Sequence, residues 1–364
     1  MTNNLLIIIG AFAISMLCGF VLIPVILNFC KARGLYDIPN KRKMHKTKVP
    51  RLGGISFIPC MVFSFIIATA TLDVHETGHK IAINLWVLYF MVSLITIYIV
   101  GIIDDLIGLG ARIKFAAQIL AAMLLPAAGL YINHLYGFLG IQEVPVWLGV
   151  PLTVLAIVFI DNATNLIDGI DGLAASLSLL ALLGFLYGFL CLHLYAYCIL
   201  IAGLVGVLIA YLYFNLFGKE ERNRKIFMGD SGSLTLGFIL GFLFVKYIMV
   251  NPDVTPYRPG HLVFAGSLLL IPIFDVAWVI LYRLQHHKPL FQADKNHIHH
   301  KLMQAGLSMH QSLIVIVALA VAFLVLNMVA FPLIHTTGVI VTDTVLYALF
   351  HQLVDRCITR REQE

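Results

Sequence analysis

Long apolar segments recur along the whole chain and constrain its fold more than any other feature. A helix that crosses a bilayer needs about 20 mostly apolar residues, and 60% of the 364 residues are hydrophobic while only 12% are charged. A soluble domain carries about 25% charged residues, so the composition excludes soluble α/β enzymes, disordered proteins and nucleic-acid-binding proteins. We expect one all-α polytopic membrane domain, residues 1–364, a helix bundle of about 11 transmembrane helices at 5–29, 54–72, 84–103, 115–132, 146–160, 173–191, 196–217, 232–250, 262–282, 311–331 and 337–354.

The cysteines and the first segment add little chemistry of their own. The 6 cysteines stand mostly within apolar segments and show no Cys-x-x-Cys spacing, which predicts packing roles rather than disulfides or a zinc site. Residues 1–30 carry no charge, whereas a secretory signal begins with a basic region. We therefore expect this segment to be the first membrane span.

Basic residues are distributed in a way that predicts the sidedness of the chain. With about eleven spans, the segments after odd-numbered spans share one side of the membrane and hold 21 of the 24 Lys and Arg residues. Cytoplasmic loops of membrane proteins are enriched in these residues. We therefore expect the crowded side to be cytoplasmic and the N-terminus to lie outside.

Acidic residues gather on the same side, at the ends of the third, fifth and seventh expected spans. A transporter would place ionisable groups deep within several spans, and only Lys246, Asp275 and Asp343 come close to that position. Such an intramembrane acid is functional or hydrogen-bonded by default. The pattern favours an interfacial active site over a transport path with an acidic gate or a non-catalytic scaffold. The clustered acids are Asp104, Asp105, Asp161, Asp168, Asp171 and Asp230.

The first motif is a pair of adjacent carboxylates, Asp104 and Asp105, at the end of the third expected span. Each carboxylate repels the other beside a low-dielectric region, and the C-terminal end of a helix disfavours negative charge. A divalent cation or a phosphate-binding role would offset these costs. A solvated helix end is the alternative.

The second motif places amides and carboxylates at three-residue spacing, at Asn162, Asn165, Asp168 and Asp171. On a helical turn the last three would share one face. Oxygen ligands of this kind suit Mg²⁺ or Mn²⁺ better than zinc. The alternative is a polar turn between two spans.

The Asp-x-x-Asp-Gly spacing within this motif also opens the signature of CDP-alcohol phosphotransferases. That signature continues with Ala-Arg and then two further aspartates. Here Ser176 follows Ala175, and the next acidic residue is Glu220. We therefore reject this alternative.

The third motif, Phe-Met-Gly-Asp-Ser-Gly-Ser at 227–233, opens the eighth expected span. Small residues and unpaired backbone N–H groups at a helix N-terminus form an anion site. Asp230 within such a turn is better explained as a metal ligand than as a helix cap.

The fourth motif holds three histidines, His297, His299 and His300, after the ninth expected span. The spacing is not that of a His-Glu-x-x-His zinc site, and no cysteine is near. A basic cluster that contacts phosphates is favoured over a metal site.

Together the four motifs resemble the polyprenyl-phosphate N-acetylhexosamine-1-phosphate transferases, a superfamily that includes the phospho-N-acetylmuramoyl-pentapeptide transferase of peptidoglycan synthesis. The resemblance extends from about residue 34 to 306 and includes residues 39–45 and 50–54. The histidine segment followed by Gly306 looks like the branch of glycosyltransferase family 4 that uses UDP-N-acetylglucosamine and undecaprenyl phosphate. Asp161 departs from the family pattern, which has an uncharged residue there, and its role stays open.

The resemblance implies transfer of GlcNAc-1-phosphate from UDP-GlcNAc to undecaprenyl phosphate, giving undecaprenyl-pyrophosphoryl-GlcNAc and UMP. It implies Mg²⁺ as cofactor, with Mn²⁺ as an alternative, and a place in the bacterial inner membrane at the start of cell-surface polysaccharide synthesis, such as O-antigen. Another UDP-N-acetylhexosamine is the alternative donor. A homodimer is an open alternative for the assembly.

The resemblance also implies roles for individual residues. Asp230 and Asn165 would hold the metal, and Asp168 and Asp171 would bind the nucleotide or order their loop. Asp104 could act as a general base, as a nucleophile or as a positioning residue. A phosphate monoester has a second pKa of about 6 and is mostly dianionic at pH 7, so it hardly needs a base. The positioning role is therefore favoured. We assign catalysis to Asp104, Asp105, Asp168, Asp171 and His297, and substrate binding to Asn162, Lys43, His45, His299, His300 and Lys114.

Overall fold

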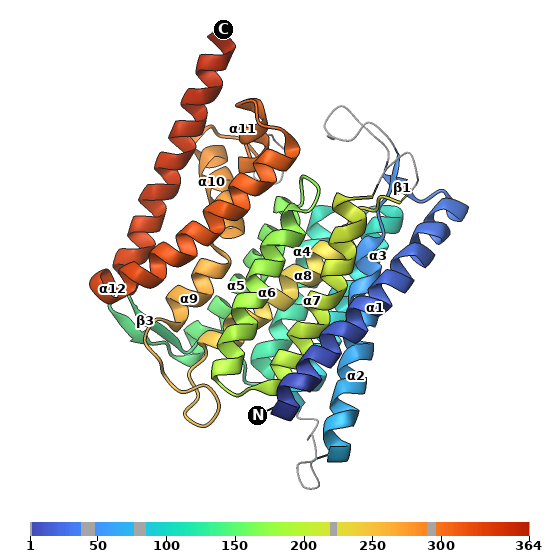
Figure 1. Ribbon diagram of the computed structural model, residues 1–364. Coiled ribbons are helices and arrows are strands. Elements are labelled where there is room, and N and C mark those ends of the chain that lie inside the picture. The colour runs from blue at the N-terminus through green and yellow to red at the C-terminus, as the bar shows by residue number, and fades with distance from the viewer. Residues whose placement is uncertain (1, 38–47, 76–84, 219–223, 290–295, 364) are drawn as a thin grey trace. The chain divides into compact units, whose positions relative to one another are not determined.

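Helices dominate the architecture, as expected for an all-α membrane protein (Figure 1). The computed structural model describes residues 2–37, 48–75, 85–218, 224–289 and 296–363. The chain forms two compact units, and each is described by itself. The expectation of one domain over 1–364 stays a prediction. The first unit is Met1–Leu130 with Ser178–Leu240, and the second is Tyr131–Leu177 with Gly241–Glu364.

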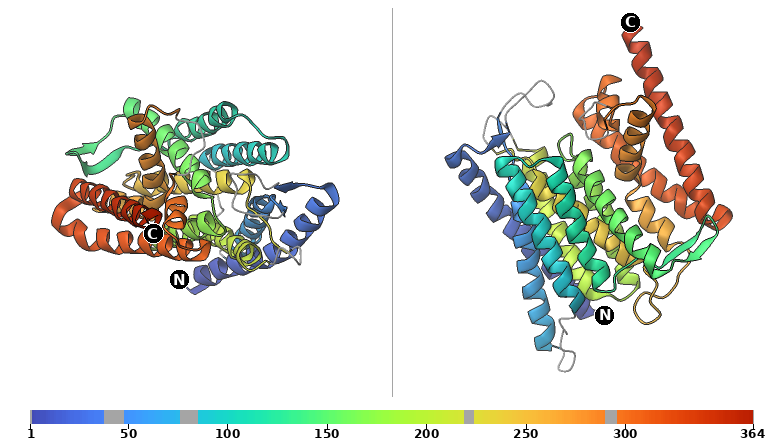
Figure 2. Two further views of the ribbon diagram at one scale, coloured as in Figure 1. Left: turned by 90° about the horizontal axis from the view of Figure 1, so that it is seen from above. Right: turned by 180° about the vertical axis from the view of Figure 1, so that it is seen from behind.

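The first unit is a bundle of long apolar helices. Helix α1 packs along α7 and α2, while α3 and α4 lie side by side (Figure 2). Small residues let membrane helices approach closely, and a Cβ at Gly19 of α1 would lie 2.8 Å from the Cβ of Ala210 on α7. Its helices are α1 (Thr2–Arg33), α2 (Phe57–His75), α3 (Leu85–Ile107), α4 (Ala111–Ala127), α6 (Leu173–Cys191), α7 (Tyr195–Leu216) and α8 (Asp230–Ile248), of which α6 and α8 extend into the second unit.

A short antiparallel ribbon precedes α2 in this unit. Strand β1 (Tyr36–Asp37) pairs with β2 (Val49–Pro50), and the 3-10 helix η1 (Gly53–Ser56) follows. The ribbon lies just before the second expected span, which begins at residue 54, and is not part of an apolar segment.

The second unit combines helices with one hairpin. Helix α5 packs on α10, and α12 packs on α9, α10 and α11. The hairpin is absent from the sequence-based expectations because its strands are short; Thr336 holds it by donating through Oγ1 to the carbonyl of Tyr136 at 2.6 Å. The elements are β3 (His134–Phe138), β4 (Ile141–Glu143), α5 (Val146–Ile167), α9 (His261–Leu268), α10 (Leu270–Gln285), α11 (Ile298–Gln304) and α12 (Met309–Gln363).

Each of the eleven expected apolar segments overlaps a helix, although residues 128–132 of the fourth lie beyond the end of α4 at Ala127. The number of spans stays a prediction. In the described part of the chain 8 helices are long and apolar enough to cross a membrane, or 9 if α9 and α10, bent by 72°, form one broken span. At 1.5 Å per residue the 55 residues of α12 would extend roughly 80 Å, far beyond a bilayer core of about 30 Å. A break at His335 (φ 55°) instead divides α12 into two arms (Figure 1), which match the expected spans 311–331 and 337–354.

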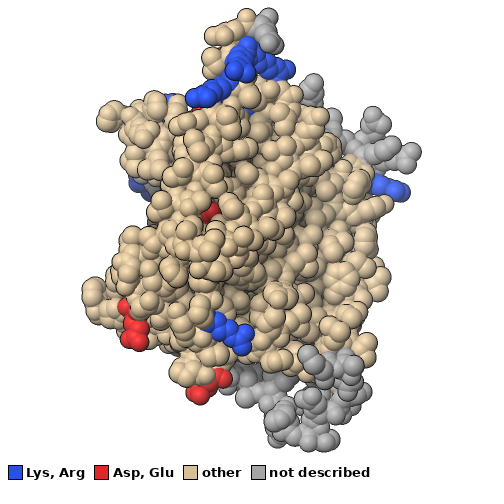
Figure 3. All heavy atoms as spheres, turned by 60° about the vertical axis from the view of Figure 1, so that its left-hand side comes forward, with Lys and Arg blue, Asp and Glu red and all other residues tan. Residues whose placement is uncertain are grey.

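The acid in the last expected span has a local partner. Asn327 on the first arm of α12 donates through Nδ2 to Asp343 on the second arm at 2.9 Å and to Ser267 on α9 at 2.8 Å. These bonds offset part of the cost of a carboxyl group in an apolar helix. Uncharged residues form nearly all of the broad middle of the face in Figure 3, with charged side chains towards its ends, as a membrane-embedded surface requires.

Candidate active site

Two motifs that are distant in the sequence lie side by side in the first unit. The amides of Gly53 and Gly54 donate to the carbonyls of Phe227 and Met228 at 2.9 and 2.8 Å, and the amide of Phe227 donates to the carbonyl of Pro50 at 2.8 Å. This backbone ladder joins the 50–54 motif to the 227–233 motif. It therefore fixes the chain immediately before α8.

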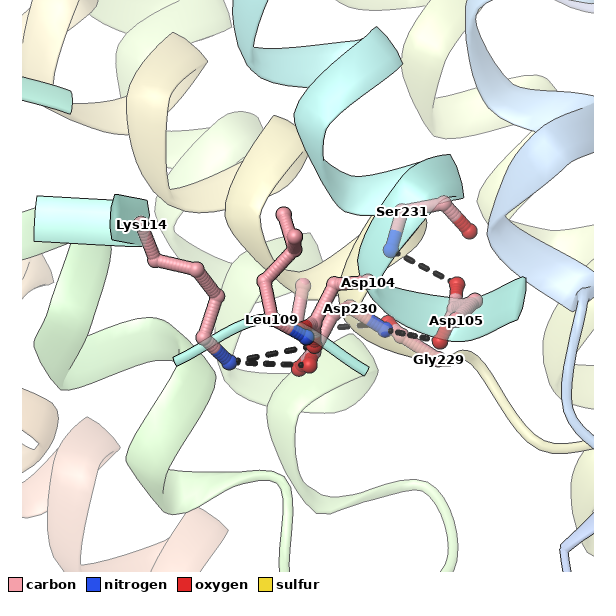
Figure 4. Close-up of polar contacts among 8 residues, drawn as sticks. Asp104, Asp105, Leu109, Lys114, Gly229, Asp230 and Ser231 are labelled. Carbon is pink, nitrogen blue, oxygen red and sulfur yellow. Dashed lines mark hydrogen bonds and ion pairs between the residues drawn. The ribbon is translucent and has the colours of Figure 1, made fainter. Parts of the chain in front are cut away.

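The carboxylate of Asp105 holds the first turn of α8. Its Oδ1 accepts the amide N–H of Asp230 at 2.8 Å, and its Oδ2 accepts that of Ser231 at 2.9 Å (Figure 4). Asp105 is only 5% exposed. Gly101 makes this approach possible, because a Cβ there would lie 2.6 Å from the Cα of Ser231. The first motif and the third motif thus form one structure.

The expected anion site at the start of α8 is filled by the protein itself, which corrects the prediction of free N–H groups. Besides the two amides bound by Asp105, the amides of Gly232 and Ser233 donate to the carbonyl of Gly229 at 3.2 and 3.1 Å. Gly229 adopts φ +74°, a conformation that glycine reaches without strain. The anion favoured by the helix N-terminus is therefore the Asp105 carboxylate.

A second carboxylate pair converges on a lysine. The Lys114 Nζ lies 3.1 Å from Asp104 Oδ2 and 3.1 Å from Asp230 Oδ2 (Figure 4). Asp104 also accepts the amide N–H of Leu109. Three elements, α3, α4 and α8, thus bring two negative groups to one positive charge.

The residues at this point fit a divalent cation that shares its ligands with a substrate. Mg²⁺ is commonly bound by one or two carboxylates together with water and substrate phosphates, and Asp104 and Asp230 supply two such carboxylates at one place. Within the described residues no group of three or more His, Cys, Asp or Glu side chains could hold a metal ion alone. The donor set therefore fits an open magnesium site better than a closed structural zinc site.

In the second unit the amide and acid motif covers the end of α5 and the turn after it. Asn162 and Asn165 lie within α5, Asp168 is the first residue after it, and Asp171 lies in the following turn. The expected common helical face is therefore wrong, because the helix ends at Ile167. All four polar residues are half-buried. Asn165 and Asp230 belong to different units, so their joint metal site stays a prediction.

The histidine motif forms α11 and the residue before it. His297 Nδ1 lies 2.7 Å from Asp275 Oδ2, and the amide of Ile298 donates to Asp275 Oδ1 at 2.8 Å. Asp275 is fully buried on α10. The expectation that this intramembrane acid is hydrogen-bonded is confirmed.

His299 is the most enclosed of the three histidines. It is 1% exposed, and burial lowers its pKa to about 3, so its ring is neutral at pH 7. No described residue hydrogen-bonds either ring nitrogen. The ring lies directly against Gly169, where a Cβ would clash with His299 Nε2, which explains the glycine between Asp168 and Ile170. The second and fourth motifs thus meet.

The structure describes most, but not all, of the expected site residues. Lys43 and His45 lie outside the described residues. The ring of His300 is tilted by 45° against the ring of His299, with 4.2 Å between the ring centroids. Asp355, which sequence reasoning missed, forms an ion pair with Lys301 at 2.8 Å. No local pattern marks Asp355, because its partner lies 54 positions away.

Comparisons with known proteins identify the family of this chain. Residues 86–248 match the family model described as Glycosyl transferase family 4. The chain is 33% identical over 321 residues to a probable undecaprenyl-phosphate N-acetylglucosaminyl 1-phosphate transferase of Bacillus subtilis (strain 168), covering 87% of this chain and 83% of the relative. It is 30% identical over 301 residues to the undecaprenyl-phosphate alpha-N-acetylglucosaminyl 1-phosphate transferase of Escherichia coli K12, covering 81% and 76% of the two chains. It is 31% identical over 310 residues to the decaprenyl-phosphate N-acetylglucosaminephosphotransferase of Mycobacterium tuberculosis H37Rv, covering 79% and 73%.

Proposed function

The chain belongs to the undecaprenyl-phosphate N-acetylglucosaminyl 1-phosphate transferases of glycosyltransferase family 4, and from this premise we propose how its polar clusters carry out the transfer. The protein is a membrane phosphotransferase that moves GlcNAc-1-phosphate onto undecaprenyl phosphate. The donor in our proposal is UDP-GlcNAc, so that the products are undecaprenyl-pyrophosphoryl-GlcNAc and UMP.

The main obstacle to this reaction is electrostatic. An anionic lipid phosphate must attack the anionic β-phosphate of the nucleotide sugar, so that positioning and positive charge supply most of the catalysis. The observation that carries our proposal is the convergence of Asp104 and Asp230 on the Lys114 ammonium group. A place built for one positive charge between two carboxylates suits the required cation.

We assign the metal to this place. Asp230 and Asp104 would hold Mg²⁺, or Mn²⁺ in its place, with Asn165 as a further oxygen ligand. When bound, the ion would neutralise charge on the diphosphate and polarise the phosphorus that is attacked. Asp105 keeps the Asp230 end of this site in place through its bonds to the first turn of α8.

The remaining residues act on the substrates. Lys114, His297 and His300 would offset phosphate charge, and neutral His299 would donate one ring N–H to a substrate oxygen. Asp168 and Asp171, with Asn162, would order the turn that meets His299 and contact the nucleotide. Lys43 and His45 complete the set of substrate-binding residues as predictions.

For Asp104 we favour positioning over proton abstraction. Its carboxylate already accepts from Leu109 and Lys114. A phosphate monoester with a second pKa of about 6 is mostly dianionic at pH 7. The acceptor therefore needs alignment more than it needs a base.

The membrane setting follows from the acceptor lipid. The protein is a multi-pass membrane protein with bacterial relatives. We propose that it resides in the cytoplasmic membrane with its site on the cytoplasmic face and its N-terminus outside, because UDP-sugars are made in the cytoplasm and the polyprenyl tail stays in the bilayer.

A homodimer stays a prediction that native mass spectrometry in detergent would check.

The test is UMP release by purified protein with UDP-GlcNAc, undecaprenyl phosphate and Mg²⁺. The variant Asp230→Ala should lose nearly all activity, and Asp253→Ala, which removes an exposed carboxylate elsewhere, should keep it. EDTA should abolish turnover, and Mg²⁺ should restore it. Full activity of Asp230→Ala would contradict the metal assignment, and faster turnover with UDP-GalNAc would contradict the choice of donor.

A further inference from the structure

A fully buried carboxylate on α10 makes two directed hydrogen bonds to the histidine segment. Asp275 is 0% exposed, and its two oxygens are used separately: Oδ2 faces His297 Nδ1 at 2.7 Å and Oδ1 accepts the Ile298 amide at 2.8 Å. Burying a carboxylate is costly unless it is hydrogen-bonded. These two bonds are therefore the reason that the acid is tolerated within an apolar helix.

The two bonds together fix the position and the orientation of the His297 ring. The Ile298 amide is the first N–H group of α11, so its bond to Oδ1 sets where the short helix starts relative to α10. The bond to Oδ2 then sets the direction of the His297 ring. An ionised carboxylate is only an acceptor, so Nδ1 carries the proton and Nε2 is the ring nitrogen that can act on a ligand. No described residue hydrogen-bonds Nε2 of His297.

We propose that Asp275 is a positioning residue for the transfer reaction, acting through His297. It holds the ring so that Nε2 faces the phosphate groups. This inference rests on the phosphate-binding role of His297 in the proposed function. Carboxylate partners that orient a functional histidine typically contribute 10–100-fold to activity in metal sites.

A second contact on the same helix supplies the matched control. Lys301 of α11 pairs with Asp355 of α12 at 2.8 Å, and the Asp355 side chain is 50% exposed. Breaking this ion pair perturbs α11 without touching Asp275 or His297. Asp355→Asn is therefore the control for a general loosening of the helix.

The experiment is a double-mutant cycle with steady-state kinetics in detergent, using Asp275→Asn, His297→Gln and the double variant. Asp275→Asn should lower kcat by about 10–100-fold and change KM for UDP-GlcNAc by less than about twofold. In the His297→Gln background the same substitution should change kcat by less than about twofold, because residues that act as a unit are not additive. Asp355→Asn should have the same small effect in both backgrounds.

Three outcomes would overturn the inference and one would overturn its premise. An equal loss from Asp275→Asn with and without His297 means that the carboxylate only supports the fold, and a loss confined to KM contradicts positioning for the chemical step. Full activity of His297→Gln would contradict the phosphate-binding role assigned to His297. If Asp275→Asn melts far below wild type, Asp275→Glu is the variant to measure, because it keeps the charge at a displaced position. It should show the same fall in kcat at unchanged KM. Wild-type kcat in Asp275→Glu would also contradict the inference.

Discussion

Lys114 shows how one residue links the fold to the proposed metal site. Its ammonium group lies 3.1 Å from each of two carboxylates that would otherwise repel each other. In the absence of a divalent ion, it is the positive charge that compensates Asp104 and Asp230. Lys114 would therefore stabilise the metal-free protein and compete with the proposed ion for the same oxygens.

Replacing Lys114 with Met should separate these two effects. Without metal, Lys114→Met should melt below wild type, by roughly 2–4 °C for each 1 kcal/mol lost. Added Mn²⁺ should then raise its melting temperature more than that of wild type, because binding to the folded state stabilises it. Differential scanning fluorimetry in detergent measures both, with exposed Lys288→Met as the control. A smaller Mn²⁺ response in Lys114→Met than in wild type would contradict the competition.

Burial of His299 makes the stability of the folded protein depend on pH in a defined direction. Its pKa is lowered by burial to about 3 in the folded protein, against about 6.5 in an unfolded chain. The unfolded state therefore binds a proton that the folded state does not, below about pH 6.5. The stability that neutral His299 contributes is complete above that pH and decreases as the pH falls towards 3, by at most about 1.4 kcal/mol per pH unit.

The matching variant is His299→Gln, which cannot be protonated. Its melting temperature should change less than that of wild type between pH 7 and pH 5. Parallel curves for the two proteins over this range would show that His299 is not a buried neutral histidine.

At the scale of elements, the start of α8 depends on a carboxylate from α3. Asp105→Asn keeps one acceptor but places an NH₂ group opposite a backbone N–H. An unsatisfied buried donor costs about 1–3 kcal/mol. We expect a lower melting temperature, faster hydrogen exchange of the Asp230 and Ser231 amides, and reduced activity. Asp253→Asn is the control, and unchanged exchange at both amides in Asp105→Asn would contradict this role.

The helices could be predicted from the sequence because apolar length is a local property. Even so, α5 extends beyond the expected end at 160 to Ile167. Polar side chains do not end it, because they bond within the helix: Asn162 Nδ2 donates to the Val158 carbonyl at 2.8 Å and Thr164 Oγ1 to the Ile160 carbonyl at 2.9 Å. Hydrophobicity alone cannot show such compensation.

The grouping of Asp104, Asp105 and Asp230 was predictable, whereas the individual partners of these residues were not. The motifs identify Asp104, Asp105 and Asp230 as residues of one site, because charges are rare in so apolar a chain. Asp105 binds backbone amides while Asp104 faces Lys114, and this difference depends on the packing of α3 against α8. The bond between Asp105 and Asp230 joins residues that are 125 positions apart in the sequence. Contacts of this kind arise from tertiary structure and leave no periodic signal.

At the scale of the whole molecule, the charge distribution predicts which side of the membrane each end occupies. With 21 of 24 Lys and Arg residues on one side of the expected spans, the C-terminus should be cytoplasmic. Green fluorescent protein fused after residue 364 should fluoresce, and alkaline phosphatase fused within residues 76–84 should be active in the periplasm. The reverse pattern would contradict the proposed orientation and the cytoplasmic site.

The class of the reaction is defined by which bond of the donor is broken. A phosphosugar transfer moves the β-phosphate with the sugar, whereas a sugar transfer leaves both phosphates on the nucleotide. The most direct measurement is therefore to incubate purified protein, Mg²⁺ and undecaprenyl phosphate with UDP-GlcNAc labelled at its β-phosphate. We predict that the label enters the lipid product together with GlcNAc and that unlabelled UMP is released. Release of labelled UDP, or a lipid product that carries GlcNAc without the label, would contradict the account.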